Sequence, residues 1–139
     1  MHLHKCKARH HEPINDYFKA VYVALDATTG LTGIISESLS NADPFPKIWL
    51  EDGGADDWSN KDDNGLEAFV NLHVGSQKEG TKEIRGLMDK CHGALHNVDL
   101  VLANGQSVLC QFVRHDVVID SDGITRHGIM RFKLLVSEV

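Results

Sequence analysis

Two β-prone runs joined by a short turn decide the fold of this chain: VLCQFVRHDVVI (108–119) and ITRHGIMRFKLLV (124–136), with DSDG (120–123) between them. Asp-Gly supplies the positive φ that tight turns require, so the two runs are predicted to form an antiparallel hairpin. A third run, 98–102, precedes them across Asn104-Gly105, which has the same property. The C-terminal third of the chain is therefore predicted to be a three-stranded antiparallel meander.

The remaining elements follow from hydrophobic periodicity. Residues 66–74 alternate apolar and polar side chains, which is typical of a half-buried strand. Apolar residues at helical spacing predict one helix from about Asn15 to Thr28 and a second from about Gly80 to His96. The predicted fold class is α+β, with an antiparallel β-sheet and two α-helices packed on one face.

Two shorter elements are predicted between the first helix and the alternating strand. Residues 34–39 are expected to contain a short strand, and 47–50 a second one directly after Pro44-Phe45-Pro46. A proline beside the start of a strand indicates an edge position or a first residue. Of the two tryptophans, Trp49 in this second strand is predicted to be a core residue.

Length and composition exclude several classes of protein. A chain of 139 residues with 42% hydrophobic and 24% charged residues fits one soluble globular domain. No apolar run approaches the roughly 20 residues that a membrane helix needs, so no membrane association is expected. The formal charge of −6 disfavours non-specific binding of nucleic acids, because binding to phosphates requires clusters of Lys and Arg.

The charges are distributed unevenly along the chain. Residues 1–13 hold four of the nine histidines and no apolar periodicity, so they are predicted to be a flexible, His-rich basic arm before a single domain at 14–139. Residues 43–67 carry eight acidic against two basic residues. The polar part of this segment, Glu51 to Gly65, is predicted to be a long loop. An aromatic residue in such a loop often anchors a partner, so Trp58 is predicted to be an interface residue.

Several of these stretches together resemble one family. They are Pro44-Phe45-Pro46 before a strand, Leu72-His73-Val74, Ala94-Leu95-His96, and above all the stretch from Asp122 to Gly128 followed by Arg131-Phe132. In this order and spacing they resemble the tail completion or tail terminator proteins of tailed phages and gene transfer agents. The resemblance covers roughly Tyr17 to the C-terminus, whereas the His-rich arm departs from the family's usual start.

The resemblance implies a non-enzymatic, structural role. Such proteins form a ring, typically a hexamer, at the head-proximal end of the tail tube, where they stop tube growth and join the tail to the head connector. The expected partners are therefore further copies of this chain, the tail tube protein and head–tail connector proteins, with DNA passing through the ring without specific binding. The expected location is the virion tail, after assembly in the cytoplasm of the bacterial host.

No catalytic, cofactor-binding or metal-binding residue is predicted. The expected interface residues combine the acidic segment with the end of the predicted hairpin: Trp58, Asp56, Asp57, Asp62, Asp63, Arg126 and His127. Within the hairpin, Arg126 is expected to lie opposite Asp116 or Val117 as a cross-strand charge partner.

The alternative is a small metal-dependent hydrolase that uses His115 and His127 with nearby aspartates (Asp116, Asp120, Asp122). Two further sets of possible metal ligands are His92 with His96, at i and i+4, and the arm residues His2, His4, Cys6, His10 and His11. Solvated histidines at a helix end and an arm that binds metal without function are the competing interpretations. A third possible class is a small ligand-binding α+β module.

Overall fold

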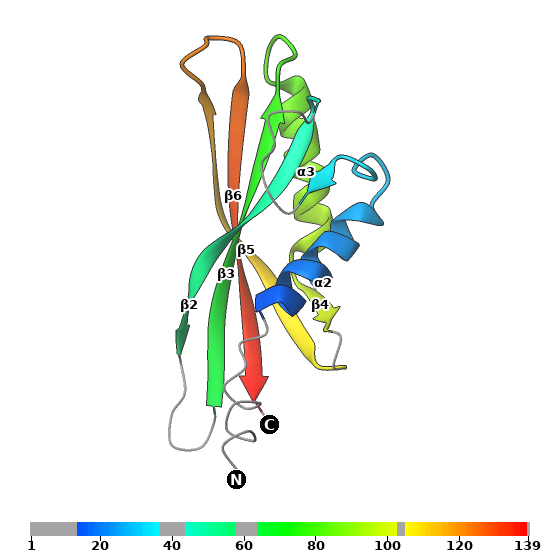
Figure 1. Ribbon diagram of the computed structural model, residues 1–139, viewed down its shortest axis with the longest axis vertical. Coiled ribbons are helices and arrows are strands. Elements are labelled where there is room, and N and C mark those ends of the chain that lie inside the picture. The colour runs from blue at the N-terminus through cyan, green and yellow to red at the C-terminus, as the bar shows by residue number, and fades with distance from the viewer. Residues whose placement is uncertain (1–13, 37–43, 58–63, 103–104, 139) are drawn as a thin grey trace.

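The computed structural model describes residues 14–36, 44–57, 64–102 and 105–138. Six strands form one sheet in the order β1-β2-β3-β6-β5-β4. The elements, labelled as in Figure 1, are α2 (Ile14–Asp26), β1 (Ile35–Ser36), β2 (Lys47–Asp57), β3 (Asn64–Ser76), α3 (Lys82–Leu95), β4 (Val98–Val101), β5 (Ser107–Ile119) and β6 (Arg126–Glu138). Both helices lie on the same side of the strongly twisted sheet (Figure 1). The predicted α+β class, with two helices on one face, is confirmed.

Every strand pair is antiparallel except the pair of β1 and β2. The predicted meander is present as β4, β5 and β6. On its other side, β6 pairs with β3 along thirteen residues of each strand. Strand β1 pairs with β2 only at Ile48 and Trp49. Pro46 therefore comes directly before the first residue of β2, Lys47. It does not indicate an edge strand, because β1 lies outside β2 in the sheet.

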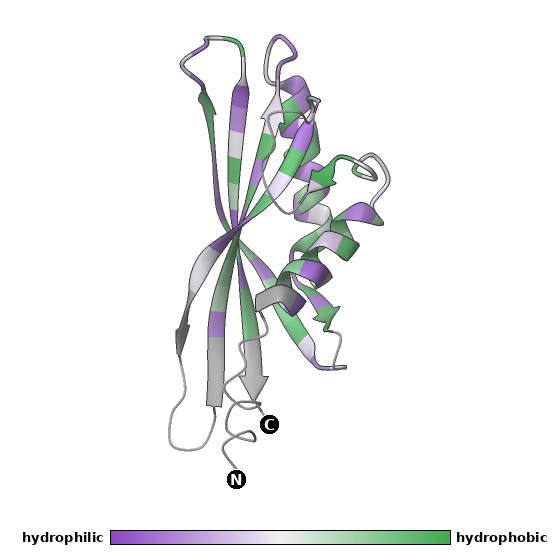
Figure 2. Ribbon diagram, viewed as in Figure 1, coloured by the Kyte–Doolittle hydropathy of each residue, from purple (hydrophilic) through white to green (hydrophobic). Residues whose placement is uncertain are grey.

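The core lies between the sheet and the two helices. In β3, the residues Ala68, Val70, Leu72 and Val74 are buried, as the alternation predicts. Helix α3 buries one stripe against this face, made of Ile84, Leu87, Met88, Cys91 and Leu95. Apolar and polar bands are interspersed along the strands and around α3 in Figure 2. Burial of this continuous apolar surface is the main force that holds the helices on the sheet.

The prediction of a long loop from Glu51 to Gly65 is wrong. Strand β2 continues to Asp57 and β3 begins at Asn64, so the connection is residues 58–63. The register shifts between Asp52 and Ala55, where Gly53 and Gly54 form an irregularity in the ladder. Gly54 has a φ of +90°, which glycine adopts without strain. The two glycines therefore make a bulge inside a strand, not the start of a loop.

The register of the β5–β6 hairpin also differs from the prediction. Arg126 lies opposite Ile119, not opposite Asp116 or Val117. The turn is two residues longer than DSDG, because the Asp122 carboxylate accepts hydrogen bonds from the N–H groups of Ile124 and Thr125 and from the Thr125 hydroxyl. These bonds hold both residues in the turn, which shifts the register of β6 by two positions.

Cys91 and Cys110 are buried free thiols. Burial raises the pKa of both thiols to about 12, so neither is a reactive thiolate near neutral pH. No helix in the described ranges is long and apolar enough to cross a membrane.

Candidate functional site

The candidate site lies on the face of the sheet opposite the helices. Successive side chains of a strand point to opposite faces, and in β2 the core takes Ile48 and Leu50. Trp49 between them therefore points away from the core and is half-buried. The prediction that Trp49 is a core residue is wrong. The same alternation places His73 of β3 and His127 of β6 on this outer face, beside Trp49.

Three aromatic rings form a compact cluster there. The Trp49 and His73 rings stack with centroids 5.1 Å apart and an interplanar angle of 9°. The His127 ring lies 5.4 Å from Trp49 and 5.0 Å from His73, in both cases tilted. We call Trp49, His73 and His127, together with Glu51 and Asp120, the outer-face cluster.

A chain of hydrogen bonds connects the cluster. His73 Nε2 lies 2.8 Å from Glu51 Oε1, and because a carboxylate only accepts, this nitrogen carries the proton. In neutral His73 the other nitrogen, Nδ1, must then accept the bond from His127 Nε2, at 2.8 Å. His127 Nδ1 is left facing Asp120 Oδ1 at 3.7 Å. The chain thus fixes one tautomer for each imidazole.

These contacts shift two pKa values in the same direction. The hydrogen bonds from His73 and Asn71 lower the pKa of Glu51 below its usual value, because they stabilise the carboxylate. Burial lowers the pKa of His127, and the neighbouring His73 adds to that effect, against a smaller opposing effect of Asp120 and Glu51. Near neutral pH the cluster therefore contains a charged carboxylate beside a neutral His127.

A shallow pocket of about 350 Å³ adjoins this cluster. Its walls combine two aromatic side chains with polar and charged groups: Phe45, Lys47, Trp49, Gly75, Gln77, Asp120, Asp122, Thr125 and His127. The Lys47 ammonium lies 4.5 Å from the centroid of the Phe45 ring and 5.8 Å from that of Trp49. The pocket thus offers aromatic faces and both signs of charge, which suits contact with a protein surface.

The structure brings together only part of the predicted interface set. His127 lies in the outer-face cluster and Arg126 lies next to it, at the start of β6. Asp56 and Asp57 are the last residues of β2. Trp58, Asp62 and Asp63 are outside the described residues. Of the cluster, only His127 belongs to the predicted interface set; Asp120 was named for the hydrolase alternative alone, and Trp49, Glu51 and His73 for neither.

The hydrolase alternative requires His115 and His127 to face one substrate. His115 lies opposite the buried Met130, on the helix side of the sheet, whereas His127 is on the outer face. Asp116 is bound instead to Arg114, with 2.6 Å between the charged atoms. Among the residues that the structure describes, no group of three or more His, Cys, Asp or Glu side chains is arranged to hold a metal ion. The structure therefore does not assemble the proposed hydrolytic site.

The histidines at the end of α3 have a packing role. The rings of His92 and His96 lie 4.7 Å apart, and both contact the Phe112 ring of β5. His96 Nδ1 accepts the backbone N–H of Phe112 at 3.1 Å, and His96 Nε2 lies 3.2 Å from the Asn97 amide. Both histidines are half-buried, so the interpretation as solvated helix-end side chains is wrong. The arm residues His2, His4, Cys6, His10 and His11 are outside the described residues.

The outer-face cluster leads to a prediction about pH. We expect NMR titration to place the midpoint of His127 below 6.5, the ordinary pKa of a histidine. His127 favours its neutral form in the folded chain, so the stability it contributes is present above pH 6.5 and is lost as the pH falls through its folded pKa. The free energy of unfolding of the variant His127→Gln should therefore decrease less steeply with falling pH than that of the parent.

A second variant separates the two causes. His73→Gln removes the neighbouring imidazole but leaves His127 covered, so the His127 midpoint should move part of the way back toward 6.5. An unshifted midpoint in this variant would show that burial alone determines the pKa. A wild-type midpoint at or above 6.5 would contradict the arrangement of the cluster.

Comparison with known proteins identifies the fold and the family. The structure superposes on a chain of the virion of a native gene transfer agent (GTA) particle with a TM-score of 0.75, covering 90% of this chain and 97% of that one at 19% identity. At this identity the match shows a shared fold. In sequence, the tail completion protein gp17 of Bacillus phage SPP1 is 25% identical over 105 residues, which are 74% of this chain and 76% of that protein.

The family model of tail completion protein gp17 matches residues 19–137, which include every described strand and helix except the first five residues of α2 and the last residue of β6. The resemblance inferred from the sequence is thus confirmed. The chain therefore belongs to the tail completion protein gp17 family, whose members are structural proteins of the virion and not enzymes.

Proposed function

We propose that this chain completes the tail by forming a ring at the head-proximal end of the tail tube. The ring blocks the open end of the tube, which stops its growth, and its other face binds the head–tail connector. The observation that carries the proposal is the family match over nearly the whole described fold. The relative from Bacillus phage SPP1, which is likewise a tail completion protein, supports it.

The ring requires one subunit surface to bind a different surface on the next copy. Such a head-to-tail contact closes when its rotation divides a full turn, and six copies are the number that the family resemblance implies. A sheet with helices on one face only leaves the outer face open to the tube or the connector. The pocket beside the outer-face cluster, which His127 lines, is proposed as part of that contact, together with Arg126, the residue before His127 in the sequence.

The acidic segment is proposed to serve the passage of DNA. Glu51 and Asp52 are exposed on β2, and the sequence continues with Asp56, Asp57, Asp62 and Asp63. Carboxylates that face a channel repel phosphate and keep a duplex from adhering to the wall. Trp58, between these acids in the sequence, is proposed to anchor a protein partner.

The test is the mass of the chain in solution, measured with and without purified tail tube protein. We expect association into a discrete ring, weak for the isolated chain and strong when tube ends are present. Rings that close before they meet a tube end would remove subunits from tail assembly. Electron micrographs of tubes grown with the chain should show tubes that end in an added ring. A chain that remains monomeric and leaves tube growth unchanged would refute the proposal.

A further inference from the structure

The hydrogen-bond chain of the outer-face cluster ends in an unmatched contact. With both imidazoles neutral, Glu51 fixes the proton of His73 on Nε2, and His73 Nδ1 accepts the N–H of His127. The remaining nitrogen, His127 Nδ1, then carries a lone pair and faces Asp120 Oδ1 at 3.7 Å. Two acceptors that face each other repel. The neutral chain therefore satisfies every contact except the one at Asp120.

One added proton removes this mismatch. A proton from solvent binds His127 Nδ1, which then donates to the Asp120 carboxylate. The proton on His127 Nε2 can move along the 2.8 Å hydrogen bond to His73 Nδ1, so that His127 is neutral again and the positive charge lies on His73. His73 then donates from both nitrogens, to Glu51 at 2.8 Å and to His127. Every contact in the chain now joins a donor to an acceptor.

A second proton does not fit this arrangement. It would place N–H groups on both His73 Nδ1 and His127 Nε2, which are 2.8 Å apart, and a positive charge on each of two rings whose centroids are 5.0 Å apart. Two facing donors form no hydrogen bond, and like charges oppose the second ionisation. The lowered pKa of His127 agrees with this order, because burial and then the neighbouring His73 cause it.

Two other charged groups line the pocket beside the rings. The Lys47 ammonium lies 4.5 Å from the centroid of the Phe45 ring, and this fixed positive charge adds to the cost of a second proton on the histidines. The Asp122 carboxylate accepts hydrogen bonds from Ile124 and Thr125 within its own turn. Neither group replaces Asp120 as the acceptor that His127 Nδ1 faces.

Strand β5, on the other side of β6, adds no further charge to the rings. It places the apolar Val118 opposite His127. The acid two residues before it, Asp116, is bound to Arg114 at 2.6 Å. Among the described residues, the carboxylates in contact with the two rings are therefore the two that belong to the outer-face cluster.

We propose that the outer-face cluster is a pH switch, which takes up one proton and with it binds the turn 120–125 to the sheet through His127 and Asp120. In the neutral state the Asp120 side chain is 42% exposed and open to the pocket that it lines. In the protonated state it is bound by His127 Nδ1, at the usual distance of about 2.9 Å. Because the N–H and C=O of Asp120 are bonded to Thr125 and Gly123, the turn moves with it and the pocket narrows. The switch is a property of the free chain and does not require the ring.

NMR of the imidazole nitrogens in the full chain tests the switch, with His73→Gln and His127→Gln to assign the resonances. As the pH falls, we expect His127 to exchange tautomers in a first step, so that Nδ1 gains a proton and Nε2 loses one, while His73 becomes doubly protonated. A separate step at lower pH should then protonate His127 fully. The switch is overturned if His127 keeps its proton on Nε2 until it ionises, or if the two rings titrate independently.

The variant Asp120→Asn tests the contact at the end of the chain. Asparagine has the shape of aspartate, but its amide group can donate to the lone pair of His127 Nδ1, which satisfies the neutral chain without an added proton. We expect the first step to move to lower pH. The backbone bonds of the turn do not involve this side chain, so the variant should keep the melting temperature of the parent. A first step at the pH of the parent would refute the role of Asp120.

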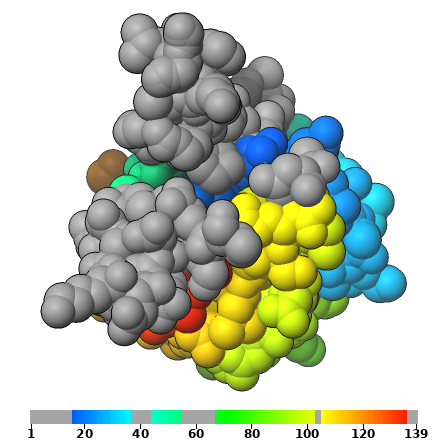
Figure 3. All heavy atoms as spheres, turned by 90° about the horizontal axis from the view of Figure 1, so that it is seen from below, coloured from blue at the N-terminus to red at the C-terminus, as the bar shows by residue number. Residues whose placement is uncertain are grey.

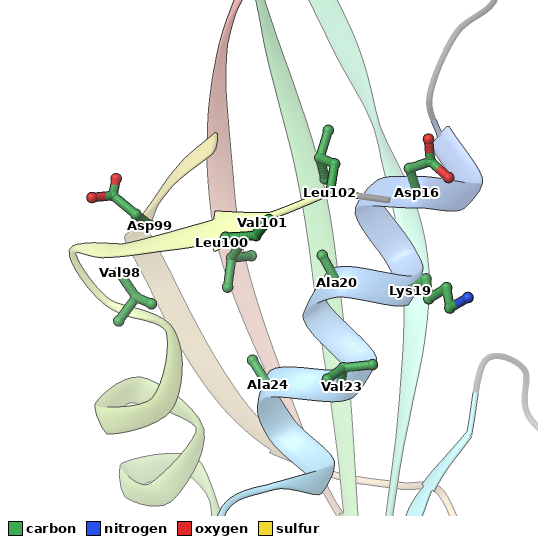
Figure 4. A pocket seen from close by; sticks show the side chains of 10 residues that line it. All are labelled: Asp16, Lys19, Ala20, Val23, Ala24, Val98, Asp99, Leu100, Val101 and Leu102. Atoms are coloured by element: carbon green, nitrogen blue, oxygen red, sulfur yellow. The ribbon is translucent and has the colours of Figure 1, made fainter. Parts of the chain in front are cut away.

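Asp99→Asn is the matched control, since it removes the same charge from an exposed aspartate of β4. At that end of the molecule, seen from below in Figure 3, the residues near the start of β5 (yellow) lie beside the first turns of α2 (blue). Figure 4 shows Asp99 at the groove between α2 and β4, which no histidine lines. Its ladder partner Leu109 pairs with Leu135 of β6, about 26 Å along the strand from His127. Both steps should therefore occur at the pH of the parent.

Binding to purified tail tubes shows whether the switch acts on the proposed contact, and this part rests on the proposed function. An Asp120 carboxylate bound by His127 is no longer available to a partner in the pocket. Tube binding should then weaken about threefold from about pH 7.5 to about pH 5.5, the usual size for an exposed ionic contact, and Asp120→Asn should lose most of this dependence. Equal affinities at the two pH values, with the tautomer exchange observed, would support the switch and refute the pocket as a tube contact. Absence of the tautomer exchange would refute the switch whatever the affinity for tubes.

Discussion

Replacing Phe132 by alanine is expected to lower the free energy of unfolding by about 3–5 kcal/mol, the cost of emptying a large buried site. Phe132 is 1% exposed and lies in the middle of the sheet, opposite Val70 of β3 and Phe112 of β5. Its ring meets that of Phe112 edge to face, with centroids 5.7 Å apart. Urea denaturation of the full chain measures the loss, and the slope of the transition shows whether unfolding stays cooperative.

Phe69 supplies a matched control for this prediction. It lies one strand away on the outer face, where its ring is half-buried under the Arg131 guanidinium at 4.0 Å. Phe69→Ala removes the same group but leaves little cavity, so the expected loss is about 1–2 kcal/mol. Equal losses for the two variants would mean that the helix side of the sheet is not the principal core.

The sequence pattern predicts the core faces well where apolar and polar residues alternate, as they do from Ala68 to Val74. It fails at 47–50, because Ile48, Trp49 and Leu50 are all apolar and an unbroken run does not indicate which residues point inward. Trp49 is the residue displaced to the outer face, where the two histidines provide the flat surface that its ring packs on.

The site was missed for a different reason. His73 and His127 are 54 positions apart in sequence, and only the pairing of β3 with β6 brings their rings together. Sequence reasoning had recognised both strands but not that they are neighbours. The register of β3 against β6 aligns His73 with Ile129 and Gly75 with His127, so the two histidines lie two residue pairs apart on the same face.

The extension of β2 shows how a partner strand overrides local composition. Gly53, Gly54 and the surrounding acids favour a loop by propensity. Strand β3, however, has the alternation of apolar and polar residues that determines which face of this part of the sheet is buried. Strand β2 pairs with β3 although its own second half lacks such an alternation. Gly53 is required there because a Cβ at this position would lie 2.9 Å from the Phe69 Cβ and 3.0 Å from its carbonyl oxygen. Glu51 and Asp52 are exposed residues within β2, so acidic composition does not indicate an absence of structure here.

Replacing Trp58 by alanine is expected to weaken binding to the tail tube protein at least about thirtyfold. Strand β2 ends at Asp57, so Trp58 is the first residue after the ladder, and the acids Asp56, Asp57, Asp62 and Asp63 surround it in the sequence. A tryptophan that anchors an interface typically contributes 2 kcal/mol or more, which corresponds to that factor in Kd. Titration of the full chain onto purified tubes measures the loss, and the yield of joined particles should fall with it.

The variants Trp58→Phe and Asp62→Asn distinguish an aromatic anchor from the acidity of the segment. A phenylalanine keeps most of the apolar contact and should retain more of the affinity than alanine does, whereas removal of one carboxylate should change binding only severalfold and more at low salt. All three variants should unfold at the temperature of the parent, because the β2–β3 ladder is complete at Asp57 and Leu66 without them. If Trp58→Ala binds tubes within a factor of two of the parent, the anchor lies elsewhere, and the pocket beside Trp49 becomes the surface to mutate next.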